Sequence, residues 1–480
     1  MSTADSSLPL CSYVNGQSLA VGSAVSCWEA AGRPGLTLRI DEADERLVDQ
    51  AVQGAARAFA RYRQASLAER MAVLGKLAAA LDAEAPALAD LISQDVGKPI
   101  RVARGEVARG ASFVRACVAE IAQQGGEVIP VDAVQAGAGR FGFTKRHPYG
   151  VVGAITPFNA PINLLVQKVA PALAAGNACV VKPAPAGIRT ALHLAQAAVE
   201  QGLEPGLFNV LAGGKDAAIA LASHTGVGVV SFTGGVEAGE SLARCTGVRR
   251  FVSELGSNAA NVVLADADLD EAARKIAAAS FEASGQQCIS AQRVIVEAAV
   301  YDDFVERFVQ YARALRVGPA DQEDVDVGPV VSRASADRIM GLVDDALSTG
   351  AQALLAPKRE GLLISPVILG GLTPSARLWH EEVFGPVAVL IKADSPAQAL
   401  DIANDSPFGL QAAVFTSSLK QAFTFSERLE VGALWVNEAS RFRLDMYPFG
   451  GMKLSGVGRE GVRYAIEELS QVKFTGIHWR

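Results

Sequence analysis

The chain has 480 residues, of which half are hydrophobic and a fifth are charged, with a formal net charge of −7 and a pI of about 5.5. This length predicts two or three domains, and this composition is typical of a globular protein and not of a disordered one. The acidic balance argues against general binding to nucleic acids or to membrane surfaces, which requires a basic face.

The N-terminal stretch and the cysteines bear on the compartment. Residues 1–22 contain no basic segment that leads into an apolar one, so we expect no signal peptide. The longest uncharged stretch, between His147 and Lys168, contains Pro157 and Pro161, which makes a membrane helix implausible. The six cysteines show neither a CxxC pair nor the spacing of zinc ligands, and the five histidines are scattered. We therefore expect a reduced cytoplasmic protein without a metal site.

In chain order, residues 41–124 are predicted to be helical. Hydrophobic residues between Leu47 and Phe59 recur at positions i, i+3 and i+4, and a second helical stretch runs from Leu67 to Leu81. The GKP sequence at 97–99 interrupts the pattern before a further helix.

From about residue 150, short apolar strands alternate with amphipathic helices. This alternation predicts βαβ units with a parallel sheet that is buried on both faces, which is an α/β, doubly wound fold. Ligands of such sheets bind beyond the carboxyl ends of the strands. The predicted strands lie within 149–159, 178–182, 207–213, 226–234 and 249–255.

A second α/β region is predicted from about 256 to 453. Its expected helices lie at 270–285, 301–315 and 336–350, and its expected strands at 292–300, 386–393, 412–416 and 432–437. Residues 126–146 and 464–480 are strand-like or amphipathic and lie outside both α/β regions, as an arm between subunits often does.

One cysteine stands in an unusual setting. Free cysteines are among the most buried residues, so the ordinary explanation for Cys288 is a place in the core. Its surroundings in SGQQCI are polar and contain Gly285, which is not typical of a core. It also falls where a helix should end and a strand begin, which is a usual place for functional groups.

Four other features follow predicted strands, and each has an ordinary alternative. Glu254 ends the last strand of the series and faces the ligand crevice, unless it is a solvated or capping charge. Asn159, in TPFNAP, is either a turn residue or an amide donor to an oxyanion. Lys182 either extends along apolar surface or reaches a ribose or phosphate. Gly234 and Gly235 precede a helix whose N-terminus could hold a pyrophosphate, although they do not form a GxGxxG pattern.

Taken together and in this order, these segments resemble the aldehyde dehydrogenase superfamily over nearly the whole chain. The matching segments are TPFN (156–159), VVKPA (180–184), FTGG…G (232–239), ELGSN (254–258), GQQC (285–288), EEVFGPV (381–387), WVN (435–437) and PFGGMKLSGVGRE (448–460).

The resemblance implies a division into domains. Residues 1–125 and 147–255 would form the dinucleotide-binding domain, and residues 256–453 the catalytic domain with its nucleophilic cysteine. Residues 126–146 and 464–480 would form a β-type oligomerisation arm, and the protein would be a homodimer or a homotetramer.

The resemblance also implies a mechanism. Cys288 would attack the aldehyde carbon to give a thiohemiacetal, with Asn159 and the Cys288 backbone N–H holding the oxyanion. After hydride transfer to NAD or NADP, Glu254 would activate the water that hydrolyses the thioester to the free acid. A carboxylate suits that task only if an apolar or closed site raises its pKa.

By resemblance, further residues would hold the cofactor. Lys182 and Glu382 resemble a ribose-binding pair, and Phe384 would lie beside the nicotinamide end. The remaining expected cofactor contacts are Thr156, Pro157, Phe158, Pro185, Gly234, Gly235 and Leu255.

Two departures from the family pattern bear on the choice of cofactor. Pro185 stands where many NAD-specific members carry a glutamate that binds the adenosine ribose and repels a 2′-phosphate. Gly235 replaces a frequent serine, which removes one hydroxyl contact to phosphate. NADP therefore stays open beside NAD, which is slightly favoured.

The segment ASRFRLDMYPFGG carries the best indication of a substrate, because it resembles the branch of lactaldehyde, phosphonoacetaldehyde and related semialdehyde dehydrogenases. Arg441 and Arg443 could clamp an anionic end of the substrate. The alternative is a surface loop of solvated arginines, or an ion pair between Arg443 and Asp445. Gln287, where some acid-specific relatives carry an arginine, weakens the clamp; Gln287 and Ile289 would shape the aldehyde pocket.

Three other functions remain as alternatives. A CoA-acylating dehydrogenase would typically lack a base at the position of Glu254. A cofactor-free hydrolase would leave Lys182 and the EVFGP segment without a purpose. A non-catalytic relative is disfavoured because Cys288, Glu254, Asn159 and Lys182 are all present.

Overall fold

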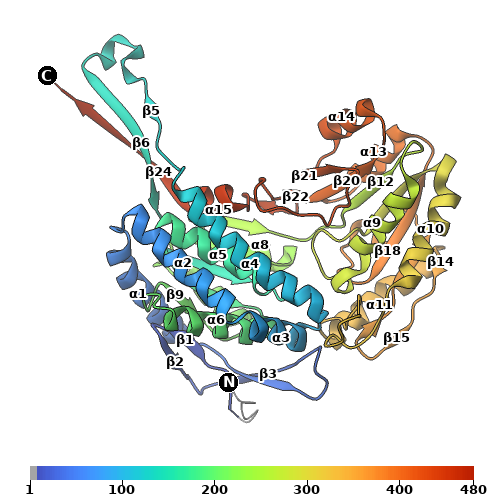
Figure 1. Ribbon diagram of the computed structural model, residues 1–480, viewed down its shortest axis with the longest axis horizontal. Coiled ribbons are helices and arrows are strands. Elements are labelled where there is room, and N and C mark those ends of the chain that lie inside the picture. The colour runs from blue at the N-terminus through green and yellow to red at the C-terminus, as the bar shows by residue number, and fades with distance from the viewer. Residues whose placement is uncertain (1–7, 480) are drawn as a thin grey trace.

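The computed structural model describes residues 8–479, and it shows two α/β parts and a projecting arm (Figure 1). Residues 1–7 and residue 480, which the predicted domain limits include, lie outside the described residues. The α/β fold with a doubly wound parallel sheet is confirmed, and a second α/β part and a three-stranded arm accompany it.

The first sheet explains where a ligand can bind. Its parallel centre has the order β9-β8-β7-β10-β11, so the strand order reverses between β7 and β10. A crevice beyond the carboxyl ends of the strands opens at such a reversal. Nearly every residue of this centre is buried, as expected for a parallel sheet covered by helices on both faces. The strands are β9 (Phe208–Val210), β8 (Ala178–Pro183), β7 (Val151–Thr156), β10 (Val229–Thr233) and β11 (Arg250–Glu254), and the crossover helices are α5 (Asn163–Ala175), α6 (Ile188–Glu200), α7 (Lys215–Ser223) and α8 (Val236–Thr246).

The helical prediction for residues 41–124 is confirmed, and the capping and helix-ending residues lie at the ends of the helices. Asp44 caps the first helix through Leu47 N, and Ser66 forms a capping box with Glu69 at the second. Gly97 ends the third helix in the left-handed region (φ 73°), and Pro99 precedes the fourth. These helices are α1 (Glu45–Tyr62), α2 (Leu67–Ala83), α3 (Ala85–Val96) and α4 (Ile100–Ile121).

Sequence patterns missed the strands before residue 42. β1 (Ser12–Val14) and β2 (Gln17–Leu19) extend the first sheet, and β3 (Val25–Glu29) pairs with β4 (Thr37–Asp41) as a separate hairpin. β1 and β2 have three residues each, which is too short for a period of two to be recognised.

The second sheet has seven strands in the order β14-β17-β18-β13-β12-β20-β21, and all neighbours are parallel except β14 and β17. β12, β14, β17, α13 and α14 were not predicted. The strands are β14 (Gln352–Leu355), β17 (Val367–Gly370), β18 (Val387–Ala393), β13 (Arg293–Glu297), β12 (Ala260–Val263), β20 (Gln411–Phe415) and β21 (Ala433–Val436). The helices are α9 (Leu269–Phe281), α10 (Tyr301–Ala314), α11 (Arg333–Ser348), α12 (Arg377–His380), α13 (Pro396–Asn404) and α14 (Leu419–Arg428). Two short pairs accompany this sheet: β15 (Arg359–Glu360) with β16 (Leu363–Ile364), and β19 (Phe408–Gly409) with β22 (Met452–Lys453). The short β23 (Gly456–Val457) instead joins the first sheet beside β11.

The arm is an antiparallel ribbon in which β6 (Arg140–Pro148) pairs with β24 (Ser470–His478), and β5 (Val128–Ile129) adds a third strand. It projects from the body in Figure 1. The predicted arm segment 464–480 begins inside α15 (Val462–Glu468), which packs on α4 and α5 and buries Val462, Ala465 and Ile466. The exact domain limits stay a prediction.

Two negative findings concern the described residues, 8–479. None of their helices is both long enough and apolar enough to cross a membrane. Their His, Cys, Asp and Glu side chains form no group of three or more that could hold a metal ion.

Candidate active site

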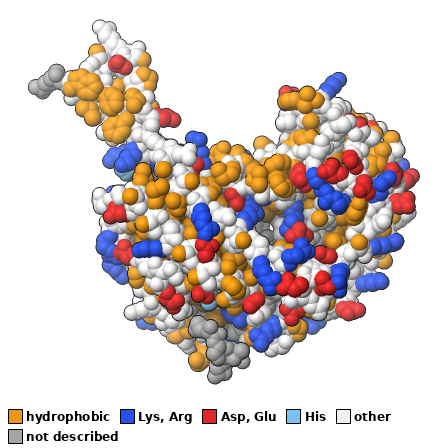
Figure 2. Space-filling view, viewed as in Figure 1, with side chains coloured by type: hydrophobic (Ala, Val, Ile, Leu, Met, Phe, Trp, Pro, Cys, Tyr) orange, Lys and Arg blue, Asp and Glu red, His pale blue; other side chains and the backbone are white. Residues whose placement is uncertain are grey.

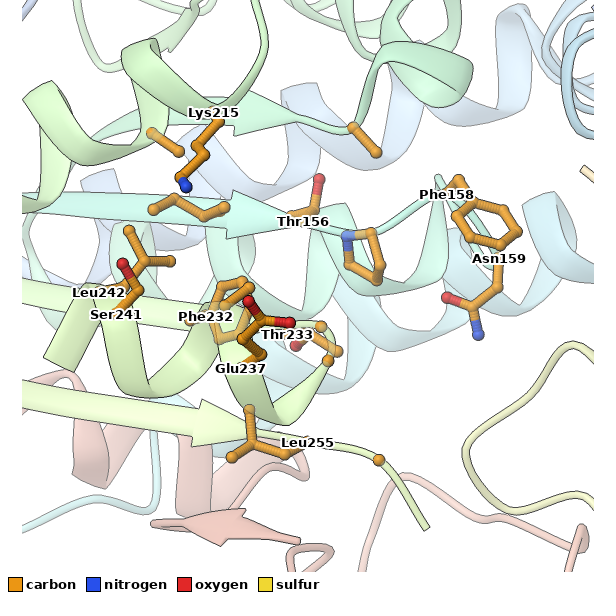
Figure 3. A pocket seen from close by; sticks show the side chains of 18 of the residues that line it. Thr156, Phe158, Asn159, Lys215, Phe232, Thr233, Glu237, Ser241, Leu242 and Leu255 are labelled. Atoms are coloured by element: carbon orange, nitrogen blue, oxygen red, sulfur yellow. The ribbon is translucent and has the colours of Figure 1, made fainter. Parts of the chain in front are cut away.

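The crevice predicted by the strand order is a cavity of about 870 Å³. Figure 3 shows it from close by, with Thr156 at the end of β7, Phe158 and Asn159 in the loop that follows, and Thr233 and Glu237 on the neighbouring β10–α8 segment. The structure brings all ten predicted cofactor residues to its wall: Thr156, Pro157, Phe158, Lys182, Pro185, Gly234, Gly235, Leu255, Glu382 and Phe384.

Two buried charged side chains in this cavity have shifted pKa values. Burial lowers the pKa of Lys182 to about 8, and its ammonium donates to the carbonyls of Gly213 and Gly214 at 3.3 Å each. Burial raises the pKa of Glu382 to about 7, although its carboxylate accepts a hydrogen bond from Ser257 N at 2.9 Å. Both side chains can therefore change their charge at little cost when a polar ligand enters.

The wall also fits a dinucleotide. Gly235 is the N-cap of α8, and a Cβ built on it would meet no described atom within 4 Å, so the start of this 11-residue helix is open to a pyrophosphate. Thr233 Oγ1 is buried and has no hydrogen-bond partner among the described residues. Phe384 packs edge-on against Phe158, with the ring centroids 5.9 Å apart, and both rings line the cavity.

The loop that carries Cys288 has an unusual backbone. Ala283 (φ 52°), Ser284 (φ 59°) and Gly285 (φ 64°) lie consecutively in the left-handed region, which costs about 1–3 kcal/mol for each non-glycine residue. Ser284 Oγ fixes this loop by donating to Gly328 O at 2.7 Å. A Cβ at Gly285 would collide with the backbone of Gly385, so only glycine fits there. The loop turns the chain between α9 and β13 and presents Cys288.

Cys288 and Asn159 stand where two cavities meet, because both line the cofactor-side cavity and a second cavity of about 540 Å³. The Asn159 amide and the Cys288 backbone N–H donate no hydrogen bond to any described residue, so both donors are available to a ligand. Burial raises the pKa of the Cys288 thiol to about 12, and Arg443 is the nearby cation that opposes this shift.

The second cavity receives the two arginines of the substrate segment, and neither is a solvated surface group. Arg441 donates to Gln287 Oε1 at 2.9 Å and to Glu282 Oε2 at 2.6 Å. Arg443 is 8% exposed and donates to Glu460 Oε2 at 3.0 Å.

Of the alternatives for these arginines, the ion pair between Arg443 and Asp445 is wrong. Asp445 instead pairs with Arg109 of α4, with Nη2 and Oδ1 2.6 Å apart. Arg443 Nε is buried and has no hydrogen-bond partner among residues 8–479, and the Arg443 guanidinium lies 3.7 Å from the centroid of the Phe449 ring. Gln287 and Ile289 also line the second cavity, as predicted.

Glu254 occupies a different place from the other candidates, since it lines neither cavity. It is 2% exposed, and neither of its carboxylate oxygens has a hydrogen-bond partner in the described part of the chain. Burial, reinforced by the charge of Glu460, raises the pKa of Glu254 well above its ordinary value. Its Oε1 faces Gly450, where a Cβ would stand 3.0 Å away, so a larger residue would crowd the carboxyl group.

A buried ion pair lies next to Glu254 and was missed in the sequence. Lys168 of α5 donates to Glu460 at 3.1 Å, and both side chains are 5% exposed or less. Lys168 and Arg443 together lower the pKa of Glu460. Two signals were available: Lys168 is the one charged residue of its apolar helix, and Glu460 ends the quoted PFGGMKLSGVGRE segment. Lys215, whose ammonium lies by the cofactor-side cavity in Figure 3, was missed as well.

Comparisons with known proteins agree with this geometry. The sequence pattern of the aldehyde dehydrogenase family matches residues 34–475. The 3-sulfolactaldehyde dehydrogenase of Priestia megaterium is 40% identical over 404 residues, which cover 84% of this chain and 85% of that protein. The lactaldehyde dehydrogenase of Methanococcus vannielii is 36% identical and covers 92% of this chain and 94% of its own length.

A solved structure supports the same relationship. The NADP-dependent glyceraldehyde-3-phosphate dehydrogenase of Bacillus halodurans, crystallised with NADP, superimposes with a TM-score of 0.95. The two chains are 33% identical, and the match covers 98% of this chain and 99% of the other.

Proposed function

The chain belongs to the aldehyde dehydrogenase family, and from that premise we propose that it oxidises a small aldehyde to the free carboxylic acid with NAD or NADP. One observation carries the proposal: Cys288 and Asn159 lie where a cavity that fits a dinucleotide meets a second cavity. A nucleophile at that junction can reach a substrate and a cofactor at the same time.

In the first step, the Cys288 thiolate adds to the aldehyde carbon and forms a C–S bond, while the carbonyl oxygen takes up the negative charge. The Asn159 amide and the Cys288 backbone N–H, which no described residue uses, support the role of oxyanion donors. Because burial raises the pKa of Cys288, the attack needs a base or a nearby positive charge to release the proton.

Lys182, Glu382, Gly234 and Gly235 would hold the cofactor at the walls that they form. When bound there, the nicotinamide would accept the hydride from the thiohemiacetal carbon and leave a thioester on Cys288.

In the second step, Glu254 takes a proton from water while the water oxygen forms a bond to the thioester carbon. The C–S bond then breaks, and the leaving sulfur takes the proton back from Glu254, which releases the acid and the thiol. The unpartnered Glu254 carboxyl supports this role, because no hydrogen bond to a described residue opposes its turning toward the thiol. The raised pKa of Glu254 suits a general base near neutral pH. This carboxyl also favours hydrolysis over transfer of the acyl group to CoA.

For the cofactor, the adenosine end of the cavity supports NADP at least as well as NAD. Pro185 places no negative charge there, and Lys215 forms no ion pair with a described residue. An ammonium at this wall would attract a 2′-phosphate.

For the substrate, the mouth of the second cavity supports an aldehyde with an anionic end. The whole cavity is lined by seven Lys or Arg side chains and by three Glu side chains. Arg441 is the strongest candidate for the contact, since it is only part-buried and is oriented by Gln287 and Glu282. Relatives named for 3-sulfolactaldehyde and for sulfoacetaldehyde fit such an anionic end.

The arm supports a homo-oligomer, either a dimer or a tetramer. Val472 and Phe474 on β24 are more than half exposed, and apolar groups on a projecting ribbon are stabilised by contact with a second copy. A reducing cytoplasm fits a chain whose six cysteines are all free.

The test is an assay of reduced-cofactor absorbance with NAD and NADP in parallel, over lactaldehyde, glycolaldehyde, succinic semialdehyde, 3-sulfolactaldehyde, phosphonoacetaldehyde and neutral aliphatic and aromatic aldehydes. We expect turnover without CoA and a preference for anionic aldehydes. Turnover that appears only after CoA is added would assign the CoA-acylating reaction instead. Bound cofactor without turnover in either assay would count against oxidation of these aldehydes.

A further inference from the structure

A third cavity, of about 820 Å³, lies at the base of the arm and shares no lining residue with the two cavities at Cys288 among the described residues. Its walls come from the loop between α1 and α2, the C-terminal end of α5, the end of β6 and the start of β24. α5 separates it from the catalytic loop: Asn163 begins that helix at the second cavity, and Ala175 ends it at the third. Thirteen helical residues span about 20 Å.

The charge of this cavity is opposite to that of the protein as a whole. No Asp or Glu of the described chain lines it, whereas the net charge of the sequence is −7. Figure 2 shows blue and pale blue side chains gathered where the arm meets the body. The basic residues that line the cavity are Arg63, Arg70, Lys145, Arg146, His147 and Lys473.

The arm itself places two of these charges against each other. Lys145 of β6 is directly opposite Lys473 of β24 in the antiparallel pair. Like charges in that position destabilise a sheet, so the pairing is unfavourable unless an anion lies between them. His147, two residues further along β6, points to the same face as Lys145.

Among these cations, only Arg146 pairs with a carboxylate of the described residues, Glu467 Oε1 at 3.8 Å, whereas Arg441 and Arg443 at the active site are both paired. Lys145, Lys473 and Arg63 form neither an ion pair nor a side-chain hydrogen bond with any of residues 8–479, although Arg63 lies over the ring of Phe59. The pKa of His147 is lowered by its partial burial and by Lys473, Lys145, Arg63 and Arg70, which agrees with charges that converge on one point.

Arg70 makes one wall of the cavity rigid. Its Nη1 donates to the carbonyl of Ala175 at 3.1 Å, at the C-terminal end of α5, and its Nε is buried without a described partner. A Cβ on Gly176 would stand 2.7 Å from the guanidinium, so the side chain is held closely against the backbone. The fixed guanidinium is suited to an oxyanion.

We propose that this cavity binds a small phosphorylated polyanion, which Lys145 and Lys473 contact from the arm and Arg63 and Arg70 contact from the body. A single carboxylate would leave most of these charges unmatched, whereas two linked phosphate groups carry enough charge to neutralise them. His147 supplies the only aromatic ring among the described lining residues, so the site offers little surface on which a nucleobase could stack. The phosphate groups, and not a base, are therefore what the cavity recognises.

The test is calorimetric titration of inorganic pyrophosphate into the full chain at constant ionic strength. We expect in each protomer a saturable site that the arm substitutions below weaken, and weaker binding of inorganic phosphate. The double variant Lys145→Gln/Lys473→Gln should bind pyrophosphate at least about 10-fold more weakly, which corresponds to about 1.4 kcal/mol.

A matched control removes two positive charges elsewhere: Lys358→Gln/Lys420→Gln, both exposed and outside every cavity described above. This control should bind as the unchanged protein does. Equal weakening in both double variants would mean general charge attraction and would overturn the proposal, as would the absence of a saturable site in the unchanged protein.

A second measurement covers folding and assembly. Pyrophosphate should raise the melting temperature of the unchanged protein and not that of Lys145→Gln/Lys473→Gln, whose own melting temperature should not fall because the two lysines repel each other. If the double variant instead loses its oligomeric state in size-exclusion chromatography and pyrophosphate has no effect on the unchanged protein, the cavity is a subunit contact and the proposal is wrong.

Discussion

The cofactor-side cavity and the second cavity meet at Cys288, but the chain builds them in different ways. The first is formed mainly by residues at the carboxyl ends of neighbouring strands of one sheet, such as Thr156 at the end of β7 and Gly234 after β10. The second is assembled mainly from α4, α5, α9 and the segment 438–443, and its Arg441 and Arg443 are each held by a carboxylate. The chemistry of the first therefore follows from local sequence, whereas that of the second depends on contacts between distant segments.

The largest expected effect comes from Cys288, because it belongs to both cavities. Cys288→Ala should lower kcat by at least about 10⁴-fold, since a missing nucleophile removes the covalent path. Binding of NAD or NADP, followed by fluorescence, should stay within about threefold of the unchanged protein, because the thiol is only one of many groups on that wall. Residual turnover near the original rate would show that the two cavities do not share this nucleophile.

Glu254 lines neither of the two cavities that meet at Cys288, and its substitution should affect only the hydrolysis of the thioester. Glu254→Gln should lower steady-state turnover by about 10²–10⁴-fold, as expected for the loss of a general base, while leaving a burst of reduced cofactor equal to the enzyme concentration. Rapid-mixing absorbance measures both phases. An unchanged steady-state rate would assign the water activation to another group, and Glu460 would then be the first to test.

The pH dependence follows from the same group. A carboxyl with a raised pKa stays protonated over a wider range of pH, and it can accept a proton from water only after it has lost its own. Thioester hydrolysis should therefore speed up as pH rises above the ordinary range of a carboxyl group. The Glu254→Gln variant should lose this rise, and single-turnover hydrolysis measured against pH compares the two proteins.

A substitution of Asn159 tests whether its amide donates a hydrogen bond to the oxyanion. Asn159→Ala should lower kcat by about 10²–10³-fold, or about 3–4 kcal/mol, if its amide stabilises the oxyanion. The melting temperature serves as the control, because a turn residue would shift stability more than rate. A loss of only a few-fold in kcat would return Asn159 to the role of a turn residue between Pro157 and Pro161.

The ten residues predicted for the cofactor all line one cavity, because parallel strands align their carboxyl ends. Lys182, for example, follows three apolar strand residues, and that position alone places it in the crevice. The left-handed loop before Cys288 was not foreseen, because Ala283 and Ser284 adopt positive φ through contacts that residue type does not reveal. Tertiary contacts overrode the local preference there.

The substrate side was predicted less well, since its partners are far apart in the chain. The nearest carboxylate in sequence suggested Asp445 as the partner of Arg443, yet Glu460 holds Arg443 while Asp445 pairs with Arg109, 336 residues away. Buried charges pair where geometry allows, and sequence distance does not determine which carboxylate is nearest. The helix α15, which overlaps the start of the predicted arm segment, was missed for the same reason: it is stabilised by packing on α5, which is distant in sequence.

A substitution of Arg441 should affect the ligand of the second cavity and not the ligand of the cofactor-side cavity. Arg441→Met should raise KM for an anionic aldehyde by about 10–100-fold, as expected for the loss of one charge-assisted hydrogen bond, and leave KM for NAD or NADP unchanged. A neutral aldehyde of similar size is the matched control and should be affected less than about threefold. Arg441→Lys keeps the charge but loses the planar fork, so partial recovery would identify bidentate contact. Equal losses with both aldehydes would mean that Arg441 only positions Gln287.

Lys215 should have the smallest effect, since it is an exposed cation at the edge of the cofactor-side cavity. An exposed ion pair contributes up to about 1 kcal/mol, so Lys215→Gln should lower kcat/KM for NADP by about fivefold and leave that for NAD unchanged. The effect should shrink in 0.5 M salt, because screening weakens a solvent-exposed pair. Lys215→Glu should widen it, since a carboxylate would repel the 2′-phosphate. If both substitutions leave the ratio of NADP to NAD unchanged, the 2′-position lies elsewhere, and the absence of a carboxylate at Pro185 would then be the remaining basis for accepting NADP.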